Sequence, residues 1–358
     1  MKDISYYPKT ISSGLYGTGH CQGIAVDEEK RVIYYAFTTQ LIKTDFDGNF
    51  IGSVGGLYGH LGCIQFRKSD GLVYGSLEYL NDSIGKAILK STGRESVEDG
   101  FYIAVFDGDK ITRADMNAET DGIMTAAFVA PATEDHLGTA PNGKPHIYGC
   151  AGIDGTAIGP MPGDCDGKEW LFVAYGVYGD VEREDNDYQI LVRYDPDELK
   201  AAAKPVVQEN MHRSGADLEY KRYFVYTGNT TYGVQNLEYD SGRGQYMLCV
   251  YTGQKERFPN YPMFLVDGGI SPKPEELRGM NGEKGEVLTL ASGNCRDGKT
   301  GITGVSYGRG STGIASLGAD ENGTAYYYVS YDYYENGLCG THVRLCRWDE
   351  NEWLVPVE

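Results

Sequence analysis

The sequence lacks the features of a membrane span and of a secretory leader. No apolar run approaches the ~18 residues that cross a bilayer. The opening residues, MKDISYYPKT, contain no apolar core of the kind found in signal peptides. We therefore expect no membrane partner, and a cytoplasmic location unless a leader was removed before residue 1.

Basic residues and paired cysteines are also scarce. The chain has 32 Lys plus Arg against 51 Asp plus Glu, a formal net charge of −19 that is spread along its length. Such a surface repels phosphate backbones, so nucleic acid is not an expected partner. The eight cysteines form no CxxC pair, which argues against a structural zinc knuckle and favours reduced, buried thiols. A nucleophilic cysteine paired with His20 or His60 stays open for Cys21, Cys63 and Cys150, which all lie close to the starts of repeats.

Long helical stretches are missing as well. One run, PDELKAAAK at Pro196–Lys204, predicts a helix, with Asp195 as its N-cap. The chain is instead rich in glycine (49) and tyrosine (29). Tyrosine suits a pleated, half-buried surface and glycine supplies turn positions with positive φ, so this composition favours many short strands.

A faint repeat divides the chain. Five segments begin with a few small residues that lead into an apolar strand. Most of them continue into an acidic turn and a tyrosine-rich strand. They are His20–Asp27, His60–Arg67, Asp154–Met161, Gly233–Asp240 and Gly313–Asp320. Some intervals are about twice the first, so eight blades must be considered. Counting strands gives five units of four, which is the size of a propeller blade.

We therefore predict an all-β fold, a five-bladed β-propeller with four antiparallel strands per blade, and a single domain over residues 1–358. The segment Ile4–Ser13 is left over from this count. It is available to pair with the last blade and close the ring, which would remove an exposed sheet edge.

The first unit, GIAVDEEKRVIYYAFTTQLIKTDFDGNFIGSV, resembles a blade of the NHL and SMP-30-like propellers. The resemblance is architectural and covers most of the chain. A five-blade count with long loops is also similar to that of calcium-activated nucleotidases and arabinanase-type glycosidases. The catalytic motifs of these families are not found here, so the resemblance implies a fold and assigns no functional residues.

The residues that open each repeat are the predicted ligand site, because the first strand of each propeller blade lines the central channel. His20 and His60 occupy the same repeat position, and Asp154 occupies it in the third unit. Two imidazoles, one carboxylate and the amide of Gln235 could hold one divalent metal ion and leave a position for water or substrate. Without metal, His20 or His60 would act as general base with Asp154 as its partner.

The predicted roles are as follows. The catalytic residues are His20, His60 and Asp154, the metal ligands are His20, His60, Asp154 and Gln235, and the substrate contacts are Gln22, Thr156, Gln235 and Asn236. The alternative is that these side chains only hydrogen-bond the backbone groups at exposed strand ends and the waters of the channel.

Three features favour an enzyme: the polar residues that are predicted to meet at the channel, the many tyrosines, and the long loops. We expect a hydrolase or lyase that acts on a carbohydrate or related polar small molecule at the channel mouth. A non-catalytic module that binds a sugar, a metabolite or a protein stays open, because propellers serve both roles. A nucleotidase is a further option, although the negative charge argues against polyphosphate substrates.

Overall fold

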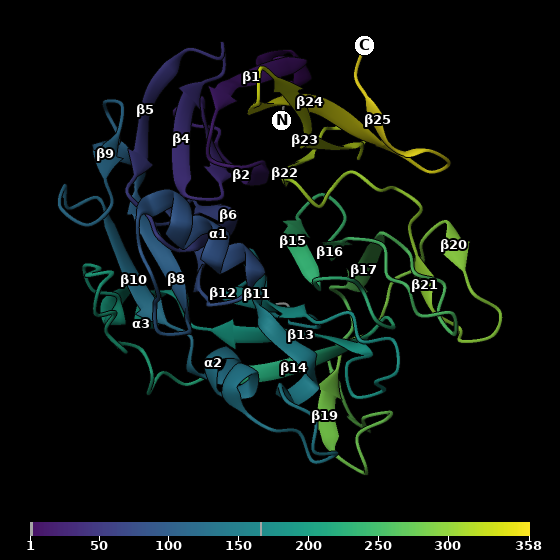
Figure 1. The fold of residues 1–358 in the computed structure, drawn as a ribbon. Coiled ribbons are helices and arrows are strands. Elements are labelled where there is room, and N and C mark those ends of the chain that lie inside the picture. Colours follow the sequence, from purple (N-terminus) through teal and green to yellow (C-terminus); the bar gives the residue numbers. More distant parts are fainter. Residues whose placement is uncertain (1–2, 165–166) are drawn as a thin grey trace.

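The structure, a computed structural model, describes residues 3–164 and 167–358. Five β-sheets stand around a central axis, so the protein is a five-bladed β-propeller, as the sequence predicts (Figure 1). Central strands such as β3 (Val32–Phe37) are buried along their whole length. They are apolar on both faces because each blade packs between two others.

Three blades contain the four antiparallel strands that were predicted. Blade 1 has β2 (Cys21–Asp27), β3, β4 (Gln40–Asp45) and β5 (Phe50–Gly55). Blade 2 has β6 (His60–Arg67), β7 (Leu72–Tyr79), β8 (Gly100–Asp107) and β10 (Met124–Phe128). Blade 3 has β11 (Cys150–Pro160), β12 (Glu169–Val177), β13 (Tyr188–Tyr194) and β14 (Lys221–Tyr226). A short strand, β9 (Met116–Asn117), adds to the edge of blade 1.

Blade 4 departs from the prediction. It contains β15 (Val234–Asp240), β16 (Gln245–Val250) and β17 (Met263–Asp267). The segment predicted as its fourth strand, residues 285–291, is divided between two blades. Its first part belongs to β19 (Lys284–Val287), which pairs in parallel with β14 of blade 3 and carries β18 (Lys273–Glu276) outside it. Its last part stays with blade 4, where Leu290 forms an antiparallel bridge with Val266 of β17. Gly285 permits the pairing of β19 with β14, because a Cβ there would come within 2.6 Å of the Phe224 ring. A small separate sheet holds β20 (Cys295–Arg296) and β21 (Thr303–Gly304).

Blade 5 joins the two ends of the chain. Its strands are β22 (Ile314–Ala319), β23 (Ala325–Glu335) and β24 (Leu338–Asp349). The outer edge of β24 is shared between β1 (Thr10–Tyr16), which pairs with residues 339–344, and β25 (Trp353–Pro356), which pairs with residues 346–349. The N-terminal segment therefore closes the ring.

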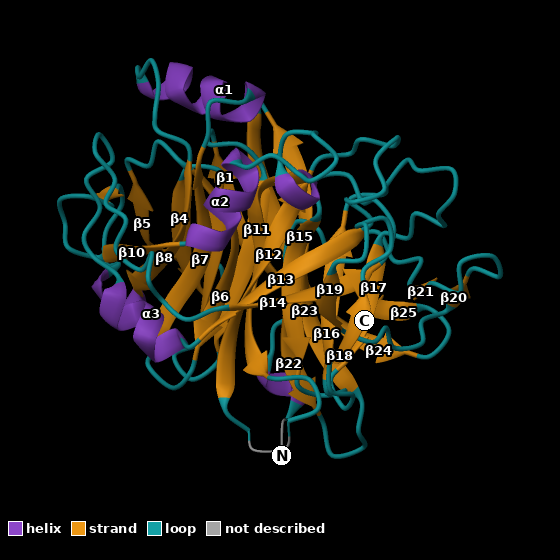
Figure 2. Ribbon diagram, turned by 90° about the horizontal axis from the view of Figure 1, so that it is seen from below, coloured by secondary structure: helices purple, strands orange, loops and turns teal. Residues whose placement is uncertain are grey.

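Helices lie outside the blades (Figure 2). α3 (Pro196–Ala202) forms where the sequence predicts it, and the Asp195 side chain caps it by accepting from the N–H groups of Asp197 and Glu198. α1 (Ser83–Thr92) and α2 (Ala130–Leu137) lie within residues 79–99 and 130–144, two of the long segments that the sequence predicts as loops between strands. Three short 3₁₀ turns complete the helical content of residues 3–164 and 167–358: η1 (Ile4–Tyr6), η2 (Gly108–Lys110) and η3 (Ile147–Gly149). None of the described helices is both long and apolar enough to cross a bilayer.

Candidate active site at the channel mouth

A cavity of about 470 Å³ lies where the inner strands begin. Residues from the start of the inner strands of blades 1 to 4 line it, together with one side of α1 and several tyrosines. The lining residues are His20, Gln22, Thr38, Tyr58, His60, Glu78, Leu80, Asp82, Ile84, Gly85, Ile88, Ala151, Asp154, Gly176, Tyr178, Tyr232, Gln235 and Tyr251. The volume is within the range of about 300–1,000 Å³ that is usual for small-molecule sites.

Irregular pairing turns the key side chains into this cavity. The pairing of β2 with β3 skips Gln22, that of β11 with β12 skips Asp154, and that of β15 with β16 skips Gln235. A β-bulge of this kind leaves one residue out of the ladder and re-aims its side chain. All three skipped residues line the cavity. The bulges thus convert the openings of three inner strands into a polar wall.

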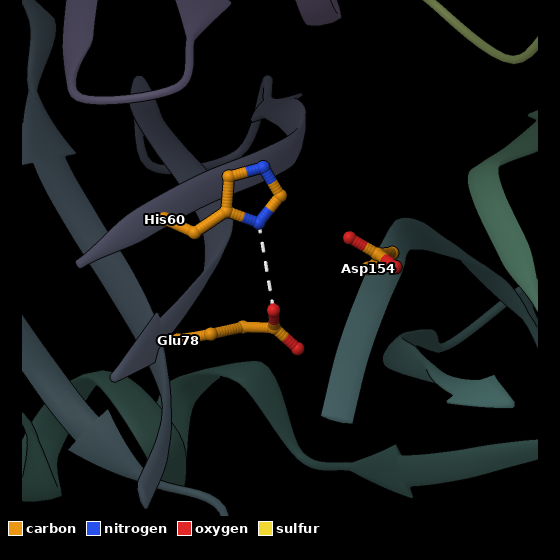
Figure 3. A group of neighbouring side chains, drawn as sticks. All are labelled: His60, Glu78 and Asp154. Atoms are coloured by element: carbon orange, nitrogen blue, oxygen red, sulfur yellow. Dashed lines mark hydrogen bonds and ion pairs between the residues drawn. The ribbon is translucent and has the colours of Figure 1, made fainter. Parts of the chain in front are cut away.

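Three side chains bring potential metal-ligand atoms together at the cavity: His60, Glu78 and Asp154 (Figure 3). One ligand atom from each lies within 4.8 Å of those of the other two. His60 opens β6, and Glu78 lies directly opposite it on β7. Their closest atoms, Nδ1 of His60 and Oε2 of Glu78, are 3.4 Å apart. Asp154 faces this pair from blade 3.

Neighbouring groups fix both carboxylates. The Ile153 N–H donates to Oε1 of Glu78 at 2.5 Å, and the Gln235 side-chain amide donates to Oδ2 of Asp154 at 2.9 Å. Gly152 makes room for Glu78, because it has φ of 143° and a Cβ there would lie 2.0 Å from Oε1. These contacts hold the two carboxyl groups toward one another.

The electrostatics show that the site is short of positive charge. Burial raises the pKa of Glu78 from 4.5 to about 8. Burial, and then the charge of Glu78, raise the pKa of Asp154 well above its ordinary value. Burial also lowers the pKa of His60, so its imidazole is neutral at pH 7. A cation between these groups would reverse the shifts of both carboxyls, because it favours their charged forms.

The structure places His20, Gln22 and Gln235 at the cavity, as the repeat predicts. His20 immediately precedes β2, and its Nε2 lies 3.5 Å from the Tyr251 hydroxyl. It is not one of the three groups whose ligand atoms converge. Gln235 turns its amide nitrogen toward Asp154, so it supports that carboxylate by donating to it. The functional roles assigned to these residues remain predictions.

Thr156 and Asn236, which were predicted to contact substrate, do not line the cavity. Both are buried within inner strands. Asn236 donates to the backbone carbonyls of Gln22 and Ser311, and so ties β15 to blade 1 and to the loop before β22. The bulge that turns Gln235 outward leaves Asn236 facing the strands. Asn236 therefore stabilises the scaffold behind the cavity wall.

Sequence reasoning missed Glu78, because it considered only the first strand of each blade. The sequence held no signal for this pairing: the register that pairs Arg67 with Leu72 would set residue 60 opposite residue 79, and a bulge between Leu61 and Ile64 shifts it by one residue to Glu78. The thiol alternative is not favoured. Burial raises the pKa of Cys63 to about 12 and that of Cys21 well above its ordinary range. All seven cysteines in the described ranges are free, and Cys165 lies outside those ranges.

Comparisons with known proteins assign neither a family nor a function to the chain. No family model matches the chain, and no curated protein matches its sequence. The PQQ domain of a pyranose dehydrogenase from Coprinopsis cinerea aligns over 90% of this chain and 81% of its own, at 12% identity and a TM-score of 0.38. A GH43 β-1,3-galactosidase solved with galactodeoxynojirimycin aligns over 96% of this chain and 97% of its own, at 12% identity and a TM-score of 0.41.

PorZ, a surface component of the type-IX secretion system of Porphyromonas gingivalis, aligns over 92% of this chain at 10% identity and a TM-score of 0.36. The present chain spans 33% of that chain. At these identities and TM-scores the three likenesses assign no function.

Proposed function

We propose that the protein is a metal-assisted hydrolase or lyase that acts on a carbohydrate or related polar small molecule in the channel-mouth cavity. The observation that supports this proposal is the convergence of His60, Glu78 and Asp154 at the wall of a cavity large enough for a substrate. Buried acids of like charge are costly to place side by side, and the site gains its charge balance from a divalent cation.

One imidazole and two carboxylates suit zinc or manganese. Imidazole is a good ligand for zinc, and carboxylates suit manganese and other hard cations. Three protein ligands leave at least one coordination position for water or substrate, as in catalytic zinc sites. The contacts from Ile153 and Gln235 are the outer hydrogen bonds that orient such ligands. A metal ion here would lower the pKa of bound water and polarise a substrate oxygen.

His20 is the proposed general base. Burial lowers the pKa of His20, so the imidazole is neutral near pH 7 and ready to accept a proton. In a hydrolysis, it would take a proton from the attacking water and return it to the leaving oxygen. Gln22 and Gln235 would hydrogen-bond the substrate from the same wall. The second candidate is a non-catalytic sugar-binding module, which the tyrosines of the cavity also favour; it would bind the same ligands without turnover.

Metal binding by His60→Ala tests the proposal. Calorimetric titration of EDTA-treated protein with Zn²⁺ and Mn²⁺ should show one site per chain in the wild type and none in the variant. The melting temperature of the metal-free variant should stay close to that of the wild type. His212→Ala is the matched control, because this histidine is outside the cavity and contacts only backbone groups through its ring nitrogens.

Activity is then measured on a panel of glycosides with and without metal. Turnover that EDTA abolishes and that His60→Ala lacks supports the enzyme. Stoichiometric sugar binding without turnover would favour the binding module. A wild-type protein that binds neither ion would overturn the metal-assisted mechanism.

A further inference from the structure

Tyr232 occupies a strained position at the cavity. Its φ is 62°, in the left-handed region that is costly for a tyrosine, yet 53% of the residue is exposed. Because about half of this large aromatic residue is exposed, burial offsets little of the cost of its backbone conformation. Strain of this kind persists where the surroundings impose it, and it clusters at ligand-binding positions.

The turn that strains Tyr232 is built into the scaffold. Gly233 follows with φ of 75°, and a Cβ there would lie 2.4 Å from the Tyr175 carbonyl oxygen. The Gly233 N–H donates to the Thr230 carbonyl at 3.0 Å. The close approach of Gly233 to β12 therefore forces the turn, and the turn places the Tyr232 ring at the cavity.

The same turn is linked to the proposed metal ligands. The Gln235 side-chain amide donates both to the Tyr232 carbonyl at 3.1 Å and to Asp154 at 2.9 Å. The Tyr232 ring also meets Tyr251 edge to face, with centroids 6.2 Å apart. Tyr251 in turn lies beside His20. Tyr232 and the His60–Glu78–Asp154 group line the same cavity, so one ligand there can contact both.

The charges at the cavity narrow the class of ligand. Among the described residues that line it, none is lysine or arginine, whereas Glu78, Asp82 and Asp154 supply carboxylates. A uronate or a sugar phosphate would find no cationic side chain to pair with. Carboxylates and amides suit hydroxyl groups, and an exposed aromatic face suits the C–H face of a sugar ring.

We propose that Tyr232 is the stacking platform for an uncharged pyranose ring and positions that ring beside His60, Glu78 and Asp154. This inference rests on the proposed function for the carbohydrate class, and adds to it the platform and the preference for uncharged sugars. It does not depend on the metal, because the ring and the hydrogen-bonding side chains of the cavity are present without one.

The test uses metal-free protein and a panel of methyl glycosides, followed by calorimetry or ligand-observed NMR. Glucuronic acid and glucose 6-phosphate are the anionic comparisons. We expect at least one neutral methyl glycoside to bind more tightly than both anions. Tyr232→Ala should weaken that binding by about tenfold or more, and Tyr232→Phe, which keeps the ring, by less than about threefold.

Phe50→Ala is the matched control, because Phe50 is an exposed aromatic residue on β5 and does not line the cavity. It should bind the glycoside as the wild type does. Preferential binding of an anionic sugar, equal binding by Tyr232→Ala and wild type, or no glycoside binding at all would overturn the inference.

Zinc titration of Tyr232→Ala separates the two proposals. Unchanged zinc affinity with weakened glycoside binding supports both. Glycoside binding that needs Tyr232 in a protein without a zinc or manganese site would leave this inference standing and overturn the metal-assisted mechanism. Zinc binding together with a glycoside affinity that does not depend on Tyr232 would overturn this inference and leave the metal-assisted mechanism standing.

Discussion

Glu78 of blade 2 and Glu238 of blade 4 make the same contact in different surroundings. Oε1 of Glu78 accepts the Ile153 N–H in the inner strand of blade 3, and Oε1 of Glu238 accepts the Ser316 N–H in the inner strand of blade 5 at 2.7 Å. Burial raises the pKa of each from 4.5 to about 8. Each glutamate therefore ties its blade to the next one through a buried carboxyl.

The surroundings of the two carboxyls differ. The second oxygen of Glu78 faces His60, beside Asp154 and at a cavity. Glu238 lines none of that cavity, and the carboxylate two residues further along β15, Asp240, is occupied by protein donors that include the Tyr327 hydroxyl and the Gly242 N–H. A buried acid becomes a candidate ligand when its remaining oxygen meets other ligands at an accessible space.

Metal affinity should separate the two glutamates most strongly. Glu78→Gln keeps an acceptor for the Ile153 N–H but removes a charged ligand, so zinc affinity should fall by about 100-fold or more. Glu238→Gln should bind zinc as the wild type does. Calorimetric titration of both variants checks this, and equal affinities would place the metal elsewhere.

Substitution of Glu238 should have a smaller effect, and this effect should be on the stability of the fold. Glu238→Ala leaves the buried Ser316 N–H without its partner, so the free energy of unfolding should fall by about 1–3 kcal/mol in urea denaturation. Ser316→Ala is the control. It keeps the backbone N–H that meets Glu238, so we expect a change within about 0.5 kcal/mol. A large loss in Ser316→Ala would show that the hydroxyl, and not the N–H, holds the two blades.

The pH dependence of stability should show the smallest difference. Folding raises the pKa of Glu238 from 4.5 to about 8. Between these two pH values the folding reaction therefore takes up a proton. The contribution of Glu238 to the free energy of unfolding is complete below pH 4.5 and is lost as the pH rises through about 8. Glu238→Gln cannot titrate, so metal-free variant protein should lose less stability over this window, by at most about 1.4 kcal/mol per pH unit. Parallel stability curves for variant and wild type would contradict the raised pKa.

The sequence sufficed for the parts of the fold that depend on local pattern. The starts of the inner strands near His20 and at His60 could be aligned because apolar runs and turn residues recur. The start predicted at Asp154 was wrong, because β11 already begins at Cys150 and Asp154 lies within it, at a bulge. The side of the strand on which Gln235 and Asn236 lie could not be predicted, because one bulge shifts a period of two by one residue. The destination of β19 could not be predicted either, since it depends on the contact between Gly285 and Phe224 across two blades.

The closure of blade 5 has a consequence for how the chain folds during synthesis. Thr10 pairs with Arg344, and Tyr16 with Cys339, so β1 has no partner until the last strands have left the ribosome. At ordinary translation rates this wait lasts roughly 20–60 s, because more than 300 residues must be added. Meanwhile Ile11, which ends up buried, stays in water beside an unpaired strand edge. A ribosome that stalls before β24 would therefore release an open ring. Its unpaired strand edge could pair with another chain, and such a form is a target of chaperones and proteases.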